Sequence, residues 1–249
     1  MSKIKLSDHP TTPPSDLKKK KTESKTIDMI IKIGELQNKL YAEGKQSLLV
    51  VLQGMDASGK DGSIKSVFAD CNPTGIDTYG FKKPTEEEMA HDFLWRVHQK
   101  LPRKGNIMIF NRSHYEDILV QRVHKWIDDE RAEKRMRAIN AFEDLLQFDN
   151  NTRLLKFYMH ISYDKQAVEL QERIDDPSKN WKHKADDWKE REHWDEYMKC
   201  YEYAINESEV PWHIVPSDKR WYRNYFIAKT VLKTLEDMNP QLPALEPEK

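Results

Sequence analysis

SLLVVLQGMDASGKDGS, residues 47–63, joins an apolar run to a glycine-rich loop and then to a segment with helical spacing. The apolar run, residues 48–52, has the length and β-branched character of a buried strand. The loop, residues 54–60, ends in Gly-Lys, and apolar residues at Ile64, Val67 and Phe68 indicate that a helix follows. Strand, glycine-rich loop and helix in this order are typical of a P-loop, a loop that binds phosphate. We therefore predict an α/β fold with a phosphate site at this loop.

The residue types of the loop suit phosphate chemistry. Glycines let backbone N–H groups curl around phosphate oxygens, and the helix N-terminus adds a partial positive charge. Lys60 supplies a mobile cation. The alternative is a glycine-rich turn between a strand and a helix with a lysine on the surface.

Position 61 departs from the usual motif, because it holds Asp where a Ser or Thr commonly ligates magnesium. Either this loop binds no metal or nearby carboxylates do so. Magnesium prefers oxygen ligands and often uses one or two carboxylates with phosphate oxygens. We favour Asp56, inside the loop, over Asp61 as the ligand.

Composition limits the class of protein. The 249 residues suffice for one α/β domain with an elaboration, and the formal net charge of −1 provides no overall field toward nucleic acid or a membrane. We expect neither partner. The two cysteines, Cys71 and Cys200, suit reduced thiols, and no apolar run approaches a membrane span. These features predict a cytoplasmic protein.

The pattern along the chain predicts a main domain between two loose ends. Residues 1–26 are polar and read as a flexible arm, although the lysines at 18–21 offer an alternative role in collecting a polyanion. Residues 27–238 form the domain, and the proline-containing tail 239–249 is expected to be loose. Helical spacing over 27–41 ends at Gly44. Further strands are predicted at 77–81, 106–110, 153–161 and 212–215. Helices are predicted at 85–101, 128–150, 188–205 and 219–238, and another follows the strand at 153–161 and ends at residue 176.

A second polar cluster, FNRSHYED at residues 110–117, directly follows a predicted strand. Ligands of open α/β sheets lie at the carboxyl ends of strands, so this cluster should face the glycine loop. Arg112 is suited to bidentate phosphate binding. Glu116 and Asp117 are candidates for metal binding or for hydrogen bonds from a nucleotide. The alternative is a helix start with acidic residues in its first turn.

Basic residues and tryptophans alternate over residues 179–191, NWKHKADDWKER after Lys179. This composition is compatible with nucleotide stacking, and its place in the chain suits a lid that closes over phosphates and excludes water. The alternative is a pair of solvated, charged helices.

Taken together, GMDASGKDG at 54–62, FNRSHYED at 110–117 and the basic segment near 177–191 resemble the polyphosphate kinase 2 family, over about residues 27–238. The resemblance implies a three-layer α/β/α P-loop kinase fold with a mainly parallel sheet and a helical lid. It also implies phosphoryl transfer between inorganic polyphosphate and nucleotides with Mg2+, in a homodimer or homotetramer. The Tyr-Glu-Asp ending of the second motif resembles the subgroup that acts on both AMP and ADP.

Carried onto this sequence, the resemblance assigns roles at matching positions. Asp56, Lys60, Arg112 and Arg173 would be catalytic, with Asp56 the ligand of magnesium. Asn111 stands where many relatives carry an Asp, and as an amide it cannot bind metal as an anion. Phosphate or nucleotide binding is expected at Gly54, Met55, Ala57, Ser58, Gly59, Asp61, Gly62, Asn111, Glu116, Asp117 and Arg122. A basic channel for polyphosphate would draw on Lys65, Lys82, Lys83 and the lid lysines.

The sequence thus predicts a polyphosphate:nucleotide phosphotransferase that makes ATP from ADP, and ADP from AMP. An ATP-dependent nucleoside or nucleotide monophosphate kinase is the alternative enzyme, because a P-loop with a lid fits it equally well. A non-catalytic nucleotide- or RNA-binding module is a third hypothesis, against which the near-neutral charge counts.

Overall fold

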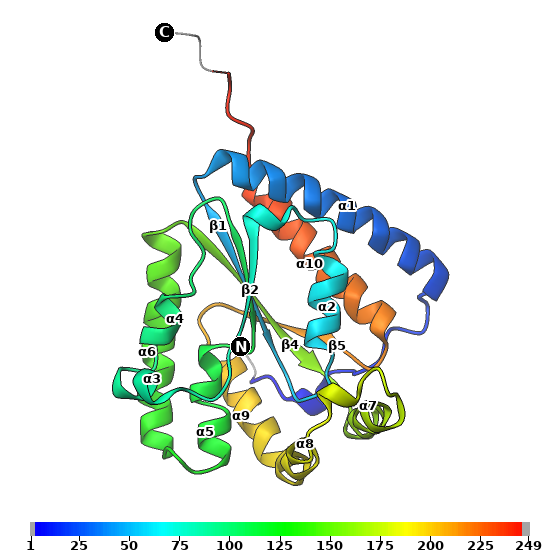
Figure 1. Ribbon diagram of the computed structural model, residues 1–249, viewed down its shortest axis with the longest axis vertical. Helices are drawn as coiled ribbons and strands as arrows, with labels where there is room; N and C mark the ends of the chain where they lie inside the picture. The colour runs from blue at the N-terminus through cyan, green and yellow to red at the C-terminus, as the bar shows by residue number, and fades with distance from the viewer. Residues whose placement is uncertain (1–2, 246–249) are drawn as a thin grey trace.

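A five-stranded sheet forms the centre of the computed structural model, which describes residues 3–245 (Figure 1). The strand order is β2-β3-β1-β4-β5, and each neighbouring pair is parallel. The strands are β1 (Ser47–Gln53), β2 (Ile76–Gly80), β3 (Ile107–Asn111), β4 (Thr152–His160) and β5 (Trp212–Pro216). The α/β class and the five predicted strands are therefore confirmed.

Helices connect the strands and cover both faces of the sheet. The α-helices are α1 (Lys19–Glu43), α2 (Lys60–Val67), α3 (Glu86–Ala90), α4 (Trp95–His98), α5 (Val120–Val123), α6 (Asp129–Phe148), α7 (Tyr163–Asp175), α8 (Asp186–Glu190), α9 (Trp194–Glu207) and α10 (Arg220–Met238). Short 3-10 helices are η1 (Leu6–Asp8), η2 (Pro73–Gly75), η3 (His114–Asp117), η4 (Asn180–Lys182) and η5 (Arg191–His193).

The fold has three layers, because side chains of each strand alternate between the two faces. Leu48, Val50 and Leu52 of β1 pack into the cluster beneath α1, α2 and α10, whereas Leu49 and Val51 face the cluster that includes α6. Figure 1 shows α1 and α10 side by side on one face, with α6 and α9 on the other. A central strand buried on both faces explains the continuous apolar run that the sequence shows there.

Over its described residues, 3–26, the N-terminal segment differs from the flexible arm that was expected for residues 1–26. Helix α1 begins at Lys19, and residues near Leu6 pack against the domain. Leu6 is only 2% exposed, within the apolar cluster that contains residues of α9. The backbone N–H groups of Ile4 and Leu6 donate 2.7 Å hydrogen bonds to side chains of α9. The buried leucine and these hydrogen bonds keep the segment packed against α9, although its polar composition indicated a solvated chain.

Two predicted helices are interrupted. The predicted helix at 85–101 divides into α3 and α4, and the side chain of Asp92 accepts a 2.9 Å hydrogen bond from Leu94 N–H between them. A capping box at Thr85 and Glu88 starts α3, as the Pro-Thr-Glu sequence predicted. The predicted helix at 188–205 divides into α8, η5 and α9. Within residues 3–245 no helix combines the length and apolarity needed to cross a membrane.

The order of the strands places the glycine loop at the carboxyl end of β1, the central strand of the sheet. Strand β1 lies between β3 and β4, with Leu52 opposite both Asn111 and Phe157. The chain proceeds from β1 toward one side of the sheet and later returns to the other side, which creates a crevice at the carboxyl ends of these strands. The residues that follow β1 and β3 therefore lie next to each other.

Candidate active site

The glycine loop wraps around the ammonium group of Lys60. Its Nζ donates to Gly54 O at 2.7 Å and to Met55 O at 3.1 Å, and lies 3.4 Å from Ser58 Oγ. Gly59 has φ +94° and is the N-cap of α2, so the first N–H groups of the helix face the loop. Residues with a Cβ rarely adopt this left-handed conformation, which explains why this position needs glycine.

The second cluster faces this loop, as predicted from its place after β3. Arg112 pairs with Asp56 of the loop and with Glu116, the latter at 3.2 Å. The Asn111 amide donates a 2.5 Å hydrogen bond to Asp61. The backbone of Arg112 has φ +64°, a left-handed conformation that a residue with a Cβ adopts at a cost.

Burial and neighbouring charges shift the pKa values of the Lys60 and Asp56 side chains. Burial lowers the pKa of Lys60 to about 8, and Arg112 adds to this effect, while Asp56, Glu116 and Asp61 oppose it. Burial alone would raise the pKa of Asp56, but Arg112, Lys60 and Arg173 outweigh it and hold that pKa below its usual value. Asp56 is therefore a carboxylate at neutral pH, surrounded by cations.

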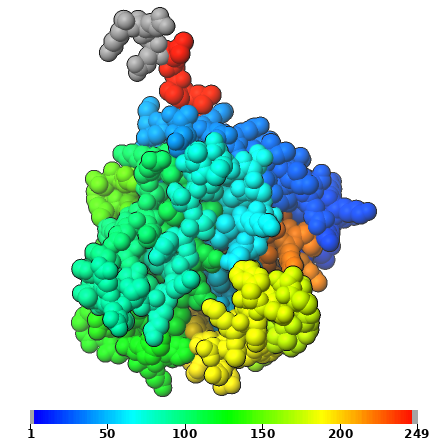
Figure 2. Space-filling view, viewed as in Figure 1, coloured from blue at the N-terminus to red at the C-terminus, as the bar shows by residue number. Residues whose placement is uncertain are grey.

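Ion pairs join the predicted lid, residues 177–191, to Asp61, directly after the glycine loop, and to α7. Lys182 Nζ lies 3.1 Å from an Asp61 carboxylate oxygen. Arg173 of α7 pairs with Asp187 of α8 at 2.6 Å, and it also donates to Lys182 O at 3.3 Å. The Trp181 side chain is 78% exposed. In Figure 2 the yellow surface of this segment lies beside the yellow-green surface of α7.

A cavity of about 550 Å³ lies between the loop, the second cluster and the lid. Nine Lys and Arg residues and five Asp and Glu residues line it, an excess of positive charge in a chain whose net charge is −1. The cations are Lys60, Lys82, Arg112, Arg173, Lys179, Lys182, Lys184, Arg220 and Arg223, and the acids are Asp56, Asp61, Glu169, Glu172 and Asp187. This composition favours a polyanionic ligand.

Sequence reasoning missed two arginines of this cavity, Arg220 and Arg223 in the first turn of α10. Arg223 is buried, and its guanidinium donates to Ser63 Oγ at 2.8 Å and to Ser58 O at 3.2 Å. Arg220 lies 2.9 Å from both Glu169 and Glu172 of α7. The signal in the sequence that could have indicated them is the pair of arginines at the start of the helix that follows strand β5.

Several predicted residues lie elsewhere. Met55 and Ser58 belong to the glycine loop, but their side chains are buried and do not line the cavity, and Lys65 is exposed on α2 outside the cavity. Arg122 pairs with Asp129 at 2.8 Å and stacks on the ring of Tyr203, so it is not brought to the loop. Among the predicted residues, the cavity collects Asp56, Ala57, Gly59, Lys60, Asp61, Gly62, Asn111, Arg112 and Arg173.

Asp117 and Arg96 line a second cavity, of about 780 Å³. Arg96 pairs with Asp117 at 3.1 Å and donates to Lys82 O at 2.9 Å. Lys82 lines the first cavity and Lys83 the second, so the two cavities are neighbours. Phe93 and Trp126 give the second cavity aromatic walls.

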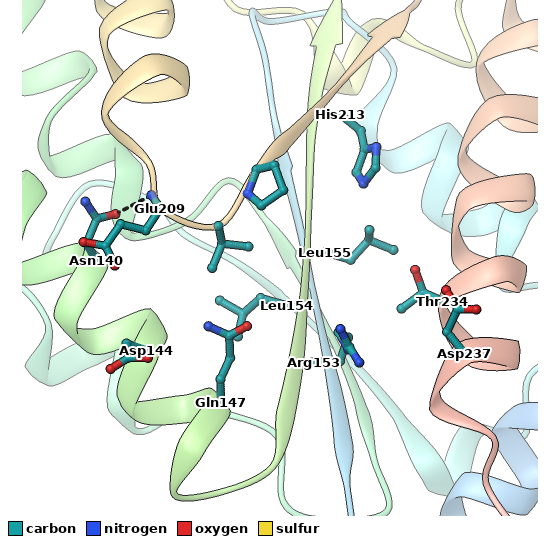
Figure 3. Close-up of a pocket in the computed structure, with 12 residues that line it drawn as sticks. Asn140, Asp144, Gln147, Arg153, Leu154, Leu155, Glu209, His213, Thr234 and Asp237 are labelled. Atoms are coloured by element: carbon teal, nitrogen blue, oxygen red, sulfur yellow. Dashed lines mark hydrogen bonds between the residues drawn. The ribbon is translucent and has the colours of Figure 1, made fainter. Parts of the chain in front are cut away.

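A third cavity, of about 350 Å³, lies near the amino end of β4 between α6 and α10 (Figure 3). Arg153, Leu154 and Leu155, from the first half of β4, form part of its lining. None of the predicted site residues lines it. The predicted site and this cavity therefore occupy opposite ends of the sheet.

The oxygen donors of the first cavity suit magnesium. Asp56 of the glycine loop and Asp61 in the first turn of α2 present carboxylates into the same cavity. Among residues 3–245 no three His, Cys, Asp or Glu side chains form a metal cluster. Magnesium is commonly held by one or two carboxylates together with substrate phosphates, so this donor set fits it. Asn111 contributes a hydrogen bond to Asp61 instead of a charge.

Comparison with known proteins identifies the family. The family model described as "Polyphosphate kinase 2 (PPK2)" matches residues 16–243. The chain belongs to the polyphosphate kinase 2 family. Residues outside the motifs therefore also follow the family pattern, since the match covers the whole domain.

Individual family members agree with this assignment. An AMP/ADP-polyphosphate phosphotransferase of Meiothermus ruber is 48% identical over 218 residues, which cover 86% of this chain and 81% of that protein. An ADP-polyphosphate phosphotransferase of Rhodopseudomonas palustris is 38% identical, with coverages of 87% and 80%. The crystal structure of polyphosphate kinase 2 from Arthrobacter aurescens TC1 matches with a TM-score of 0.95 and 36% identity, covering 100% of this chain and 91% of that one.

Proposed function

We propose that this protein transfers a phosphoryl group from inorganic polyphosphate to ADP, and also to AMP, with magnesium. The observation that carries the proposal is the cationic cavity over the glycine loop, which combines a phosphate-binding loop with arginines and lysines from five further parts of the chain. Membership of the polyphosphate kinase 2 family and the names of the related phosphotransferases support the choice of donor and acceptor.

Phosphoryl transfer requires positioning and charge neutralisation more than covalent chemistry by the protein. Lys60 and the loop amides bind the phosphates on either side of the transferred phosphoryl group. Arg112 and Arg173 neutralise the charge on the equatorial oxygens of that group. The lid excludes water, which would otherwise compete with the nucleotide as acceptor. Magnesium, held by Asp56 and the phosphate oxygens, supplies further charge neutralisation when bound. No side chain acts as a nucleophile in this scheme.

The acceptor nucleotide extends from the first cavity into the second in this proposal. Its phosphates face the loop, and its base enters between the aromatic walls at Phe93 and Trp126. Aromatic faces stack on nucleobases without the need for charge. Asp117, which was predicted to bind nucleotide, lines this second cavity and not the first.

An assay with a single phosphoryl donor tests the proposal. Purified protein with magnesium, ADP and polyphosphate should form ATP, and with AMP it should form ADP. ATP in place of polyphosphate, with a nucleoside or nucleotide monophosphate as acceptor, tests the alternative kinase. No ATP from polyphosphate, together with rapid transfer from ATP, would contradict the proposed donor. Absence of turnover with either donor would favour a binding module.

The pH profile should reveal the lowered pKa of Lys60. We expect kcat/KM, which reports the free enzyme, to fall as pH rises through about 8, because Lys60 loses its charge before phosphate binds. Bound phosphate favours the charged lysine, so kcat should hold to a higher pH. Lys60→Arg is the control: its guanidinium stays charged, and the fall in kcat/KM should move to higher pH or disappear. An unchanged profile in that variant would contradict the assignment.

The family resemblance also leads us to propose a homodimer or homotetramer in the cytoplasm, acting on nucleotides and polyphosphate and not on nucleic acid or membranes. The net charge of −1 supports the last part, because binding to nucleic acid usually depends on a strong positive surface.

A further inference from the structure

A buried polar network joins His114 and Tyr115 of the second cluster to two charged residues in the core. The proposed mechanism of phosphoryl transfer does not use this network. Lys156 of β4 and Glu143 of α6 have almost no exposed side-chain surface, and their charged atoms are 2.6 Å apart. Lys156 also donates to Tyr115 Oη at 2.6 Å. Tyr115 Oη in turn donates to Glu143 at 2.9 Å, and His114 Nε2 lies 3.2 Å from the same carboxylate oxygen.

An ion pair in this position contributes little to net stability. Removing two charges from water costs about as much free energy as their attraction returns, and buried pairs are often replaced by apolar residues without loss. What such a pair does provide is a fixed geometry, because each partner must keep its hydrogen bonds to remain buried.

The network holds the residues that directly follow Arg112. His114 and Tyr115 begin η3, two and three positions after the arginine, and both side chains point into the network. Arg112 adopts φ +64°, which the surrounding structure must enforce because a residue with a Cβ does not favour it. At its other end, η3 is fixed by the pair between Asp117 and Arg96.

We propose that the buried Lys156–Glu143 pair, acting through His114 and Tyr115, positions Arg112 against the glycine loop for phosphoryl transfer. This inference rests on the proposed function. Glu143, Lys156, His114 and Tyr115 are positioning residues, since in the structure they bond to each other and do not line the phosphate cavity. Substituting these residues should slow phosphoryl transfer only as far as it displaces Arg112 from its position against the glycine loop.

A double-mutant cycle between Tyr115 and Arg112 tests the proposal. Tyr115→Phe removes one hydroxyl and should lower kcat about 10-fold, since small misplacements of a catalytic group commonly have effects of this order or larger. In an Arg112→Lys background the same substitution should cost less than about twofold, because the group that it positions is already altered. Tyr158→Phe is the matched control: it is a buried tyrosine whose hydroxyl contacts Met198 Sδ outside the network.

Two results would overturn the proposal. One is an equal loss from Tyr115→Phe with and without Arg112, and the other is a loss no greater than that of Tyr158→Phe. A second pair of variants gives an independent readout. His114→Gln keeps an N–H donor toward Glu143 and should retain more kcat than His114→Leu, whereas a packing role alone would make the leucine at least as active. ATP formation by the wild-type protein tests the proposed function separately from these comparisons.

Discussion

Replacing Lys60 with alanine should lower kcat/KM for transfer from polyphosphate to ADP by about 100-fold or more, the usual effect of losing a group that stabilises charge in the transition state. The ammonium group lies at the centre of the loop, 2.7 Å from Gly54 O and 3.1 Å from Met55 O. No other cation occupies that position among the residues described here, since Arg112 pairs with the Asp56 side chain and Arg223 donates to Ser58 O.

Lys65→Ala is the matched control for Lys60→Ala. Lys65 lies on the same helix but is exposed and outside the cavity, so its loss should leave the rate within about twofold. Steady-state rates and thermal unfolding of both variants would separate a loss of catalysis from a loss of folded protein. Similar rates for the two variants would refute the role of Lys60.

Substituting Asp56 with asparagine should have a comparable effect, about 100-fold on kcat/KM. The change keeps the shape of the side chain but removes the charge that pairs with Arg112 and that, in our proposal, holds magnesium. The Asp56 backbone carbonyl still accepts its 2.9 Å hydrogen bond from Gln166, so the loop itself should remain in place. The magnesium concentration that gives half-maximal rate should rise, which a simple loss of folded protein would not cause.

Asp186→Asn provides the corresponding control. Asp186 is exposed in the lid and pairs with Lys189 outside the cavity, so the variant should retain nearly normal rates and magnesium dependence. If Asp56→Asn behaved like Asp186→Asn, magnesium and Arg112 would have to be held by other groups.

The fold was predictable because its signals are local. Strands β1, β3, β4 and β5 contain short apolar runs, β2 follows a turn with Pro73 and Gly75, and the capping residues of α3 and α7 are visible in the sequence as Thr85 and Ser162. The strand ends then bring the residues after β1 and β3 together by topology alone. That is why the sequence predicts that Asp56, Lys60, Asn111 and Arg112 lie at one site.

Other parts depend on contacts between distant segments, which the sequence does not display. Leu6 is buried by residues of α9, far along the chain, so the polar composition around it misleads. Asp117 and Glu116 are adjacent in the chain, yet within η3 they point to different partners, Arg96 and Arg112. Arg223 reaches the loop only because α10 packs against α2. Burial of Lys156 inside a strand is likewise visible only once Glu143 is placed beside it.

In our proposal the glycine loop holds a chain of phosphates within the cationic cavity. A crystal structure of the protein with polyphosphate and magnesium tests this most directly. We expect phosphate oxygens on the amides of the loop and on Lys60, with the chain continuing past Arg112 and Arg173. A phosphate chain bound instead in the cavity of Figure 3, with the glycine loop empty, would contradict it.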